Sequence, residues 1–151
     1  MTTKPPVALA AMEPEAVAAV AALEQASLQR PQVDIPTYHH FHAGMYARTI
    51  MIPANTVLTG ALIKIATLLI VNGEVIAYTA DGPIHLIGYH VIPAEAGRKQ
   101  AFAAVVDTIL TMVFPTSAKS VEEAEEEFTD EAAILFSRNE GAVNVVFGLE
   151  E

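Results

Sequence analysis

Residues 64–92 read KIATLLIVNGEVIAYTADGPIHLIGYHVI, and this stretch decides the fold. Runs rich in β-branched residues alternate here with turn signals, of which Asn72-Gly73 and Asp81-Gly82 are typical of tight hairpins. The pattern therefore predicts strands at 64–71 and 74–79, and a further strand that leads away from the second turn.

The same alternation continues on both sides of this stretch, and turns that contain proline or glycine separate the runs. Further strands are expected at 47–52, 57–62, 83–87, 89–92, 100–106 and 108–114. Short strands at this spacing indicate a sandwich or a small barrel. We therefore assign residues 38–115 to one mainly β domain.

An N-terminal helix is expected before the β domain. The segment 14–30 is rich in alanine, begins with Pro14 at a position where a missing N–H does no harm, and ends before Pro31. Residues 1–13 are expected to be disordered. The helix has a shallow apolar face, because most of its apolar side chains are alanines.

A second helix is expected after the β domain, within a segment 120–151 that packs on it. Ser120 and Glu123 form a capping box, and apolar residues then recur at spacings of three and four from Val121 to about Phe136. The other face is acidic and is expected to be solvated; it carries Glu122, Glu123, Glu125, Glu126, Glu127, Asp130 and Glu131.

The composition excludes several classes of protein. The 151 residues include no cysteine, so disulfides, zinc–thiolate sites and cysteine nucleophiles are absent. A formal net charge of −10 disfavours binding to nucleic acid or to anionic membranes. The apolar run from Val7 to Met12 is too short for a signal peptide or a membrane span. We expect a cytoplasmic protein.

Four short motifs carry a resemblance to a known family. They are Gly44-Met45-Tyr46-Ala47-Arg48, Ile50-Met51-Ile52-Pro53-Ala54-Asn55, Leu58-Thr59-Gly60-Ala61-Leu62, and the block from Gly88 to Gly97. With them, residues 42–114 resemble the cupin superfamily, and more narrowly the small cupin-like proteins of unassigned function from bacteria and phages. The resemblance implies a single antiparallel β-barrel of the jelly-roll type.

Cupins usually hold a divalent metal on two or three histidines and a carboxylate, and this sequence departs from that pattern. Residues 60–73 contain neither, and Gln100 stands near the place of the histidine in the second motif. Isoleucine, threonine and glutamine are poor ligands for such metals. We expect no metal in the barrel and no cofactor. His40 and His42, which share one face of a strand while His39 points away, form a weak alternative metal pair without a third ligand.

Five residues are candidates for binding a ligand in the barrel: Lys64, Tyr78, Arg98, Gln100 and Asp107. Lys64 and Asp107 each stand alone as a charge in an apolar run, so they are candidates for an ion pair inside the barrel. The alternative is that Lys64 extends from the outer face. Arg98 belongs to a small basic turn that either attracts an anion or is simply solvated.

Arg48 alternates with Tyr46 and Ile50 along a predicted strand. It either holds an anion or pairs with an acid across the sheet.

Three classes of function stay open. We favour a metal-free cupin-like protein that binds a small molecule or a protein partner, or serves as a structural subunit, with a phage or prophage association. The alternatives are a metal-dependent cupin enzyme, such as a dioxygenase or isomerase, and a metal-independent isomerase or epimerase. We also expect a homodimer, with residues 38–52 and the N-terminal helix as the contact, because the apolar fraction of 52% is high.

Overall fold

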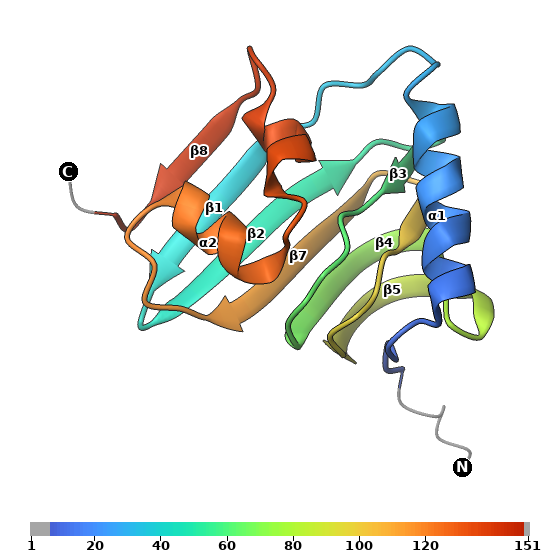
Figure 1. Cartoon of the computed structure of the whole chain (residues 1–151), viewed down its shortest axis with the longest axis horizontal. Coiled ribbons are helices and arrows are strands. Elements are labelled where there is room, and N and C mark those ends of the chain that lie inside the picture. The colour runs from blue at the N-terminus through green and yellow to red at the C-terminus, as the bar shows by residue number, and fades with distance from the viewer. Residues whose placement is uncertain (1–6, 150–151) are drawn as a thin grey trace.

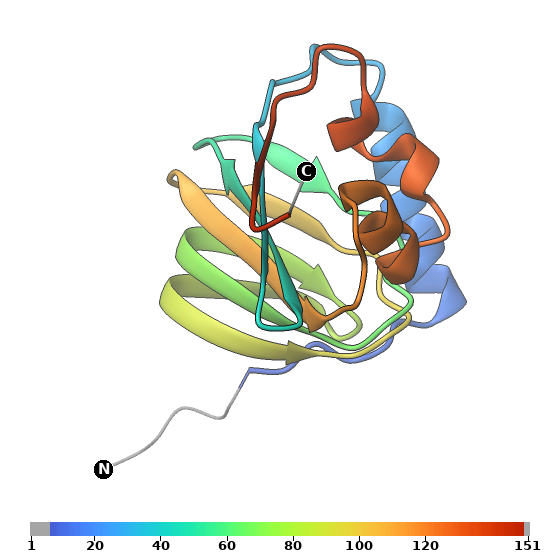
Figure 2. The same cartoon turned by 90° about the vertical axis from the view of Figure 1, so that its left-hand side faces the viewer.

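The computed structural model describes residues 7–149, which form one curled, mixed β-sheet with both α-helices inside the curl (Figures 1 and 2). The elements are α1 (Pro14–Ser27), β1 (Thr37–His42), β2 (Met45–Ile52), β3 (Val57–Thr59), β4 (Thr67–Thr79), β5 (Gly82–Ala94), β6 (Ala101–Ala104), β7 (Thr108–Pro115), α2 (Val121–Phe128), the 3₁₀ turns η1 (Ala132–Ile134) and η2 (Phe136–Arg138), and β8 (Asn144–Phe147). The protein is thus mainly β, as the sequence predicted, and the expected barrel takes the form of a half-barrel built from one curled, mixed sheet.

The sheet follows the order β3-β6-β4-β7-β2-β1-β8, and β5 pairs with the remaining edge of β4. Strand β4 changes partner along its length: residues 68–72 pair with β7 and residues 75–77 pair with β6. This change of partner lets one long strand contribute to both halves of the curled sheet. Strand β8 runs parallel to β1, so the expectation of a purely antiparallel barrel is wrong at this edge.

The predicted hairpin at Asn72-Gly73 is wrong. Both residues lie inside β4, which pairs with β5 without interruption from Thr67 opposite Ala94 to Thr79 opposite Gly82. A Cβ atom on residue 73 would lie 2.5 Å from Oγ1 of Thr108. Gly73 is therefore required by the close approach of β7 rather than by a turn. The second predicted hairpin, at Asp81-Gly82, is confirmed.

The N-terminal segment is ordered over its described part. Leu9 is buried, its N–H donates to the carbonyl of Pro93, and its carbonyl accepts from the N–H of Glu95. The expectation that residues 1–13 are disordered is therefore wrong from residue 7 onward, and residues 1–6 lie outside the described residues. Helix α1 follows close to its predicted bounds.

The second helix is shorter than its apolar periodicity predicted. It ends at Phe128 because Thr129 adopts extended backbone angles, and two 3₁₀ turns replace its expected continuation to Phe136. At its start the oxygen of Ser120 accepts from the N–H of Glu123, as in a capping box. The carboxylate of Glu123 accepts from the N–H of Lys119 rather than from that of Ser120.

The core fills the space between the curled sheet and the segments that cover its inner face (Figure 2). An aromatic series runs through it from the sheet to α2, made of Phe41, Tyr46, Phe114 and Phe128. No helix among residues 7–149 combines the length and the hydropathy that crossing a bilayer requires.

Candidate functional site

A cavity of about 120 Å³ lies inside the half-barrel. Its walls are mostly apolar; among them are Leu69, Phe102 and Met112 from the sheet and Phe128, Leu135 and Phe136 from the C-terminal segment. Three polar side chains also line it: Arg48, Arg98 and Gln100. A mostly apolar cavity with few polar groups is the usual form of a small-molecule site.

Arg98 is the most unusual of these three residues, because it is only 2% exposed and no carboxylate among residues 7–149 forms a salt bridge with it. Its guanidinium donates to Oγ1 of Thr67 at 2.7 Å, to the carbonyl of Glu95 at 2.7 Å and, more weakly, to that of Ile65 at 3.4 Å. Burial lowers its pKa to about 10, and the charge of Glu95 offsets this in part. At neutral pH it is a buried cation.

Gln100 is buried two residues further along the chain. Its backbone carbonyl accepts from the N–H of Gly60, which holds this segment against the end of β3. Its side-chain amide makes no hydrogen bond with another residue of the part that the structure describes. This amide is therefore a second polar group available to a ligand in the cavity.

The basic turn from Arg98 to Gln100 is not solvated. Lys99 is buried as well, and its Nζ lies 3.2 Å from carboxylate oxygens of both Glu24 and Glu131. These two contacts join α1 to the C-terminal segment across the start of β6. Only Arg98 and Gln100 of the turn face the cavity.

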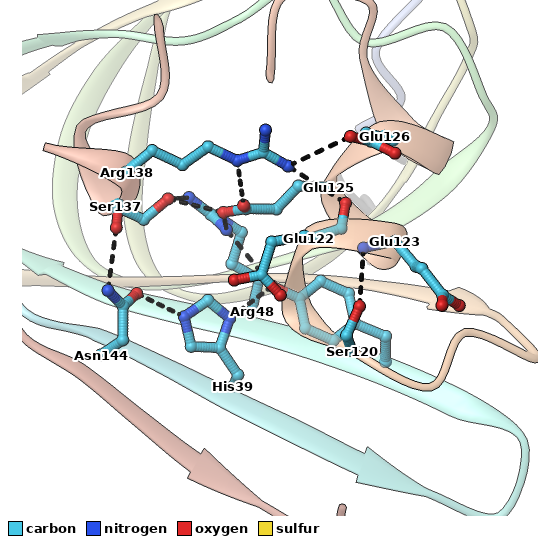
Figure 3. A network of polar contacts seen from close by, with 11 residues as sticks. His39, Arg48, Ser120, Glu122, Glu123, Glu125, Glu126, Ser137, Arg138 and Asn144 are labelled. Atoms are coloured by element: carbon cyan, nitrogen blue, oxygen red, sulfur yellow. Dashed lines mark hydrogen bonds and ion pairs between the residues drawn. The ribbon is translucent and has the colours of Figure 1, made fainter. Parts of the chain in front are cut away.

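A buried polar network lies beside the cavity and is centred on Glu125 (Figure 3). The carboxylate of Glu125, only 1% exposed, accepts from Arg48 at 2.8 Å, Arg138 at 2.8 Å and the hydroxyl of Ser137 at 2.6 Å. Burial raises the pKa of this carboxyl, but the hydrogen bonds from Ser137, Arg138 and Arg48 outweigh burial and hold the pKa below its ordinary value. Glu125 is therefore ionised at neutral pH.

The network continues through His39. Its Nδ1 lies 2.6 Å from the hydroxyl of Tyr46, and its Nε2 lies 2.7 Å from Oδ1 of Asn144. Because Nδ2 of Asn144 donates to the carbonyl of Ser137, the amide oxygen faces His39, and Nε2 must carry the proton. Nδ1 then accepts from Tyr46, whose oxygen accepts in turn from Arg48 at 3.3 Å. Burial lowers the pKa of His39 and raises that of Tyr46, so both are neutral.

The network closes into a ring, from Asn144 through His39, Tyr46, Arg48 and Glu125 to Ser137, and back to Asn144. It joins β1 and β2 to α2, η2 and β8. Arg48 also lies over the ring of Phe128, 5.3 Å from its centroid. Arg48 does pair with an acid, as one of the two expectations had it. The acid is Glu125 of α2, however, and not a residue on a neighbouring strand of the sheet.

The expected Lys64–Asp107 ion pair does not form. Nζ of Lys64 binds Oδ1 of Asp130 at 2.6 Å on the surface, and Asp107 accepts from the backbone N–H of Ala54. Tyr78 lies on the exposed side of β4. Of the five candidate ligand-binding residues, the structure brings Arg98 and Gln100 to the cavity and leaves the other three outside it.

The histidine pair is arranged as the strand alternation predicted. His40 and His42 are exposed on one face of β1, and His39 is buried on the other. The imidazole of His40 stacks on the ring of Phe147. No carboxylate or third histidine joins this pair, since residues 7–149 contain no group of three side chains that could hold a metal ion.

The divalent metal that cupins usually carry does not fit the residues around the cavity. Its polar lining consists of two arginines and one glutamine, which offer positive charge and a weak carbonyl ligand. Neither a histidine nor a carboxylate lines the cavity in the described part of the chain. The residues around the cavity therefore supply positive charge and hydrogen-bond donors rather than metal ligands.

Comparison with known proteins gives no family model and no curated protein that matches the sequence. Solved structures do resemble the chain. A cupin superfamily protein from Desulfitobacterium hafniense DCB-2 is 13% identical with a TM-score of 0.45, over 58% of this chain and 83% of its own. The structures that resemble this chain include cupins.

A cupin-2 domain protein from Shewanella frigidimarina is 14% identical with a TM-score of 0.39, over 62% of this chain and 91% of its own. Salicylate 1,2-dioxygenase from Pseudoaminobacter salicylatoxidans is 12% identical with a TM-score of 0.48, over 76% of this chain but 33% of its own. The descriptions of two of these three structures name cupins, at identities of 13% and 14%. None of these three descriptions mentions a phage, and that association stays a prediction.

Sequence reasoning missed the part that Glu125 and His39 play in the buried polar network beside the cavity. Glu125 is one of five acids in α2, and nothing in the local sequence distinguishes it from the other four. A signal did exist in Arg48, an isolated cation in a strand whose neighbours Tyr46 and Ile50 are buried. Such a cation requires a buried acid, although the sequence does not say which one.

Proposed function

We propose that this protein binds a small apolar molecule carrying a carboxylate inside the half-barrel, and that it acts by binding rather than by catalysis. The observation that carries the proposal is Arg98, a buried cation at the wall of an apolar cavity that has no carboxylate partner among residues 7–149. A buried charge without a counter-ion is costly, and an anionic ligand would remove that cost.

The hydrogen bonds of Arg98 leave room for such a ligand. A guanidinium has five N–H groups, and the described residues accept three hydrogen bonds from it. The remaining N–H groups and the amide of Gln100 are donors for a carboxylate. Arginine is well suited to this role, because its planar fork matches the two oxygens of a carboxylate.

The size of the cavity limits the ligand. Its volume of about 120 Å³ is close to that of engineered cavities, about 150 Å³, that bind benzene. The walls supply aliphatic and aromatic carbon on the sheet side and on the C-terminal side. A single-ring or short-chain monocarboxylate matches both the volume and the polarity.

The lining residues favour binding over catalysis. Catalysis near neutral pH needs a metal, an activated nucleophile or a group that exchanges protons. Arg48 is paired with Glu125, the pKa of Arg98 stays near 10, and Gln100 does not titrate. The alternatives of a metal-dependent dioxygenase or isomerase, and of an isomerase that uses Lys64 and Asp107, have less support for these reasons.

Calorimetric titration with three single-ring probes of similar size tests the proposal: the anion benzoate, the neutral isostere benzamide and the cation benzylamine. We expect benzoate to bind at least tenfold more tightly than the neutral amide, and benzylamine not to bind. The change Arg98→Met should abolish binding of benzoate. Gln100→Leu, which changes the polarity of the cavity but not its charge, should weaken it by about tenfold or less.

Two results would contradict the proposal. One is equal affinity for benzoate and benzamide, which would make the apolar walls the whole site. The other is binding of benzoate that survives Arg98→Met in a variant whose circular dichroism matches the wild type. Should Arg98→Met unfold, Gln100→Leu and competition between the charged and neutral probes decide the question.

A further inference from the structure

Gly60, which follows β3 (Figure 1), differs from the other glycines of the chain. All eight glycines lie within residues 7–149, and seven of them have a positive φ. That conformation favours glycine over residues with a side chain, so the backbone itself accounts for these seven. The φ of Gly60 is not positive. Its lack of a side chain therefore needs another reason.

Close packing does not supply that reason. Beyond its neighbours in the chain, a Cβ atom on residue 60 would meet a single atom within 4 Å, the backbone oxygen of Gln100 at 3.6 Å. This is an ordinary van der Waals distance, whereas a Cβ on residue 73 would lie 2.5 Å from the side chain of Thr108. Position 60 has space for a side chain, yet it carries none.

The strand register shows where a side chain on residue 60 would point. Leu58 of β3 lies opposite Phe102 of β6, and the N–H of Gly60 donates to the carbonyl of Gln100 at 2.8 Å, which continues this register by two residues. Residues directly opposite each other in an antiparallel pair project to the same face. Since these three neighbours all line the cavity, a side chain on residue 60 would project into the cavity as well.

We propose that the missing side chain of Gly60 makes the cavity wide enough for a ring, so that the ligand is a single-ring aromatic carboxylate rather than a short-chain one. This inference rests on the proposed function, because it concerns the same cavity. A side chain on residue 60 would begin about 5 Å from the Cβ of Gln100 and would occupy the space beside its amide. The cavity of about 120 Å³ is close in size to cavities of about 150 Å³ that hold one benzene, so a few added carbon atoms displace the ring.

The aromatic part of the lining suits a ring. Phe102 from β6, Phe128 from α2 and Phe136 from η2 all line the cavity. Aromatic rings attract one another in offset-stacked and edge-to-face arrangements, beyond the effect of the area that they bury. A chain of two or three carbons would leave much of this aromatic surface without a contact. The walls thus favour a ring, and Gly60 leaves room for it.

Substitutions at position 60 of the full chain test this inference. Benzoate is titrated by calorimetry, and propionate, as a short-chain probe, by NMR. We expect Gly60→Ala to weaken benzoate about tenfold and Gly60→Val to weaken it at least a hundredfold, because the added carbons compete with the ring. Propionate should weaken by no more than threefold in either variant. Ala66→Val adds carbon at an exposed position outside the cavity lining, and this control should bind both probes as the wild type does.

The inference is overturned if benzoate binds within threefold of the wild type in Gly60→Ala and Gly60→Val. Equal losses of benzoate and propionate also overturn it, since they would place the damage at the carboxylate, as does an equal loss in Ala66→Val. Should Gly60→Val fold poorly, Gly60→Ala decides, because its Cβ has space.

Failure of the proposed function gives a different result. A wild type that binds benzoate and benzamide equally contradicts the role of the carboxylate alone, and loss of both probes in Gly60→Val then still supports the role of Gly60. A wild type that binds neither probe contradicts both proposals.

Discussion

His39 shows how one neutral side chain depends on the residues around it. Its proton sits on Nε2 because Asn144 presents an oxygen to that atom, and Nδ1 is left to accept from Tyr46. A second proton on Nδ1 would oppose the hydroxyl hydrogen of Tyr46 and add positive charge near Arg48. The folded protein therefore disfavours the protonated imidazole.

This leads to a prediction about pH. Burial lowers the pKa of His39 from 6.5 in the folded state, so the unfolded chain binds the proton first as pH falls. The unfolded state then holds more protons, and the free energy of unfolding must decrease on acidification below about pH 6.5. Urea denaturation at pH 7.5 and pH 5.5 measures this loss. It should shrink in His39→Gln and persist in His40→Gln, because His40 is exposed.

Glu125 does not interfere with that measurement. The pKa of its carboxyl is lowered from 4.5 in the folded state. The stability that Glu125 contributes is therefore lost only below about pH 4.5, outside the interval between pH 7.5 and pH 5.5. A pH dependence between 7.5 and 5.5 that is identical in His39→Gln and the wild type would show that the imidazole is not the titrating group.

At the scale of elements, the long hairpin of β4 and β5 depends on glycines in the middle of its strands. Gly73 lies opposite Gly88 in the register, and Thr108 approaches Gly73 from β7. The hydroxyl of Thr108 accepts from the N–H of Glu74 and donates to its carbonyl. This contact supports β4 at the point where it changes partner from β7 to β6.

We predict that Gly73→Ala lowers the free energy of unfolding by about 2 kcal/mol or more. The added Cβ would lie 2.5 Å from Oγ1 and 2.8 Å from Cα of Thr108, and the residue also has a φ of +150°, which favours glycine. Gly60→Ala is the matched control, because its Cβ would meet only the carbonyl of Gln100 at 3.6 Å. Urea denaturation that finds equal losses in the two variants would contradict this account.

The elements also show which sequence signals survive folding. Period-two alternation placed β2 and β7 to within a few residues, since that signal reports which face is buried. The Asn72-Gly73 signal failed because a dipeptide favours a turn only when no neighbouring strand needs its glycine. The predicted second helix was too long. The apolar residues that continue its periodicity after Phe128 lie in and next to the 3₁₀ turns, where Leu135 and Phe136 line the cavity.

At the scale of the whole molecule, the ring around Glu125 connects the last third of the chain to the sheet. Helix α2, η2 and β8 each contribute one member, and β1 and β2 contribute the others. The same C-terminal segment supplies the cavity walls Phe128, Leu135 and Phe136. The position of these cavity walls therefore depends on this network.

We predict that Glu125→Gln lowers the free energy of unfolding by about 3 kcal/mol and speeds amide hydrogen exchange chiefly within residues 120–147. The substitution leaves Arg48 and Arg138 without their buried counter-charge, and breaking a buried ion pair typically costs 3–5 kcal/mol. Glu126→Gln on the exposed side of α2 removes only a 3.8 Å surface contact with Arg138 and should change both quantities little. Exchange that rises equally in β4 and β5 would show that the segment does not open as a unit.

The candidate site was only partly predictable. Arg98 and Gln100 could be named because the fold resemblance places the residues after Gly97 at the barrel. The prediction that Lys64 and Asp107 pair inside the barrel was wrong, because a lone charged residue in an apolar run can lie on either face of a strand or just beyond its end. The partners of Arg48 and His39 come from residues far along the chain, and only the folded structure identifies them.

Strand β1 is synthesised long before its partner β8, so the two strands can pair only late in translation. His39 and Asn144 are 105 residues apart, and a chain that grows at about 5–20 residues per second needs roughly 5–20 s to cover that distance. During this interval the outer edge of β1 lacks its strand, and its histidine lacks one of its two partners. The nascent protein therefore carries an unpaired edge of β1 until residues 144–147 have been synthesised.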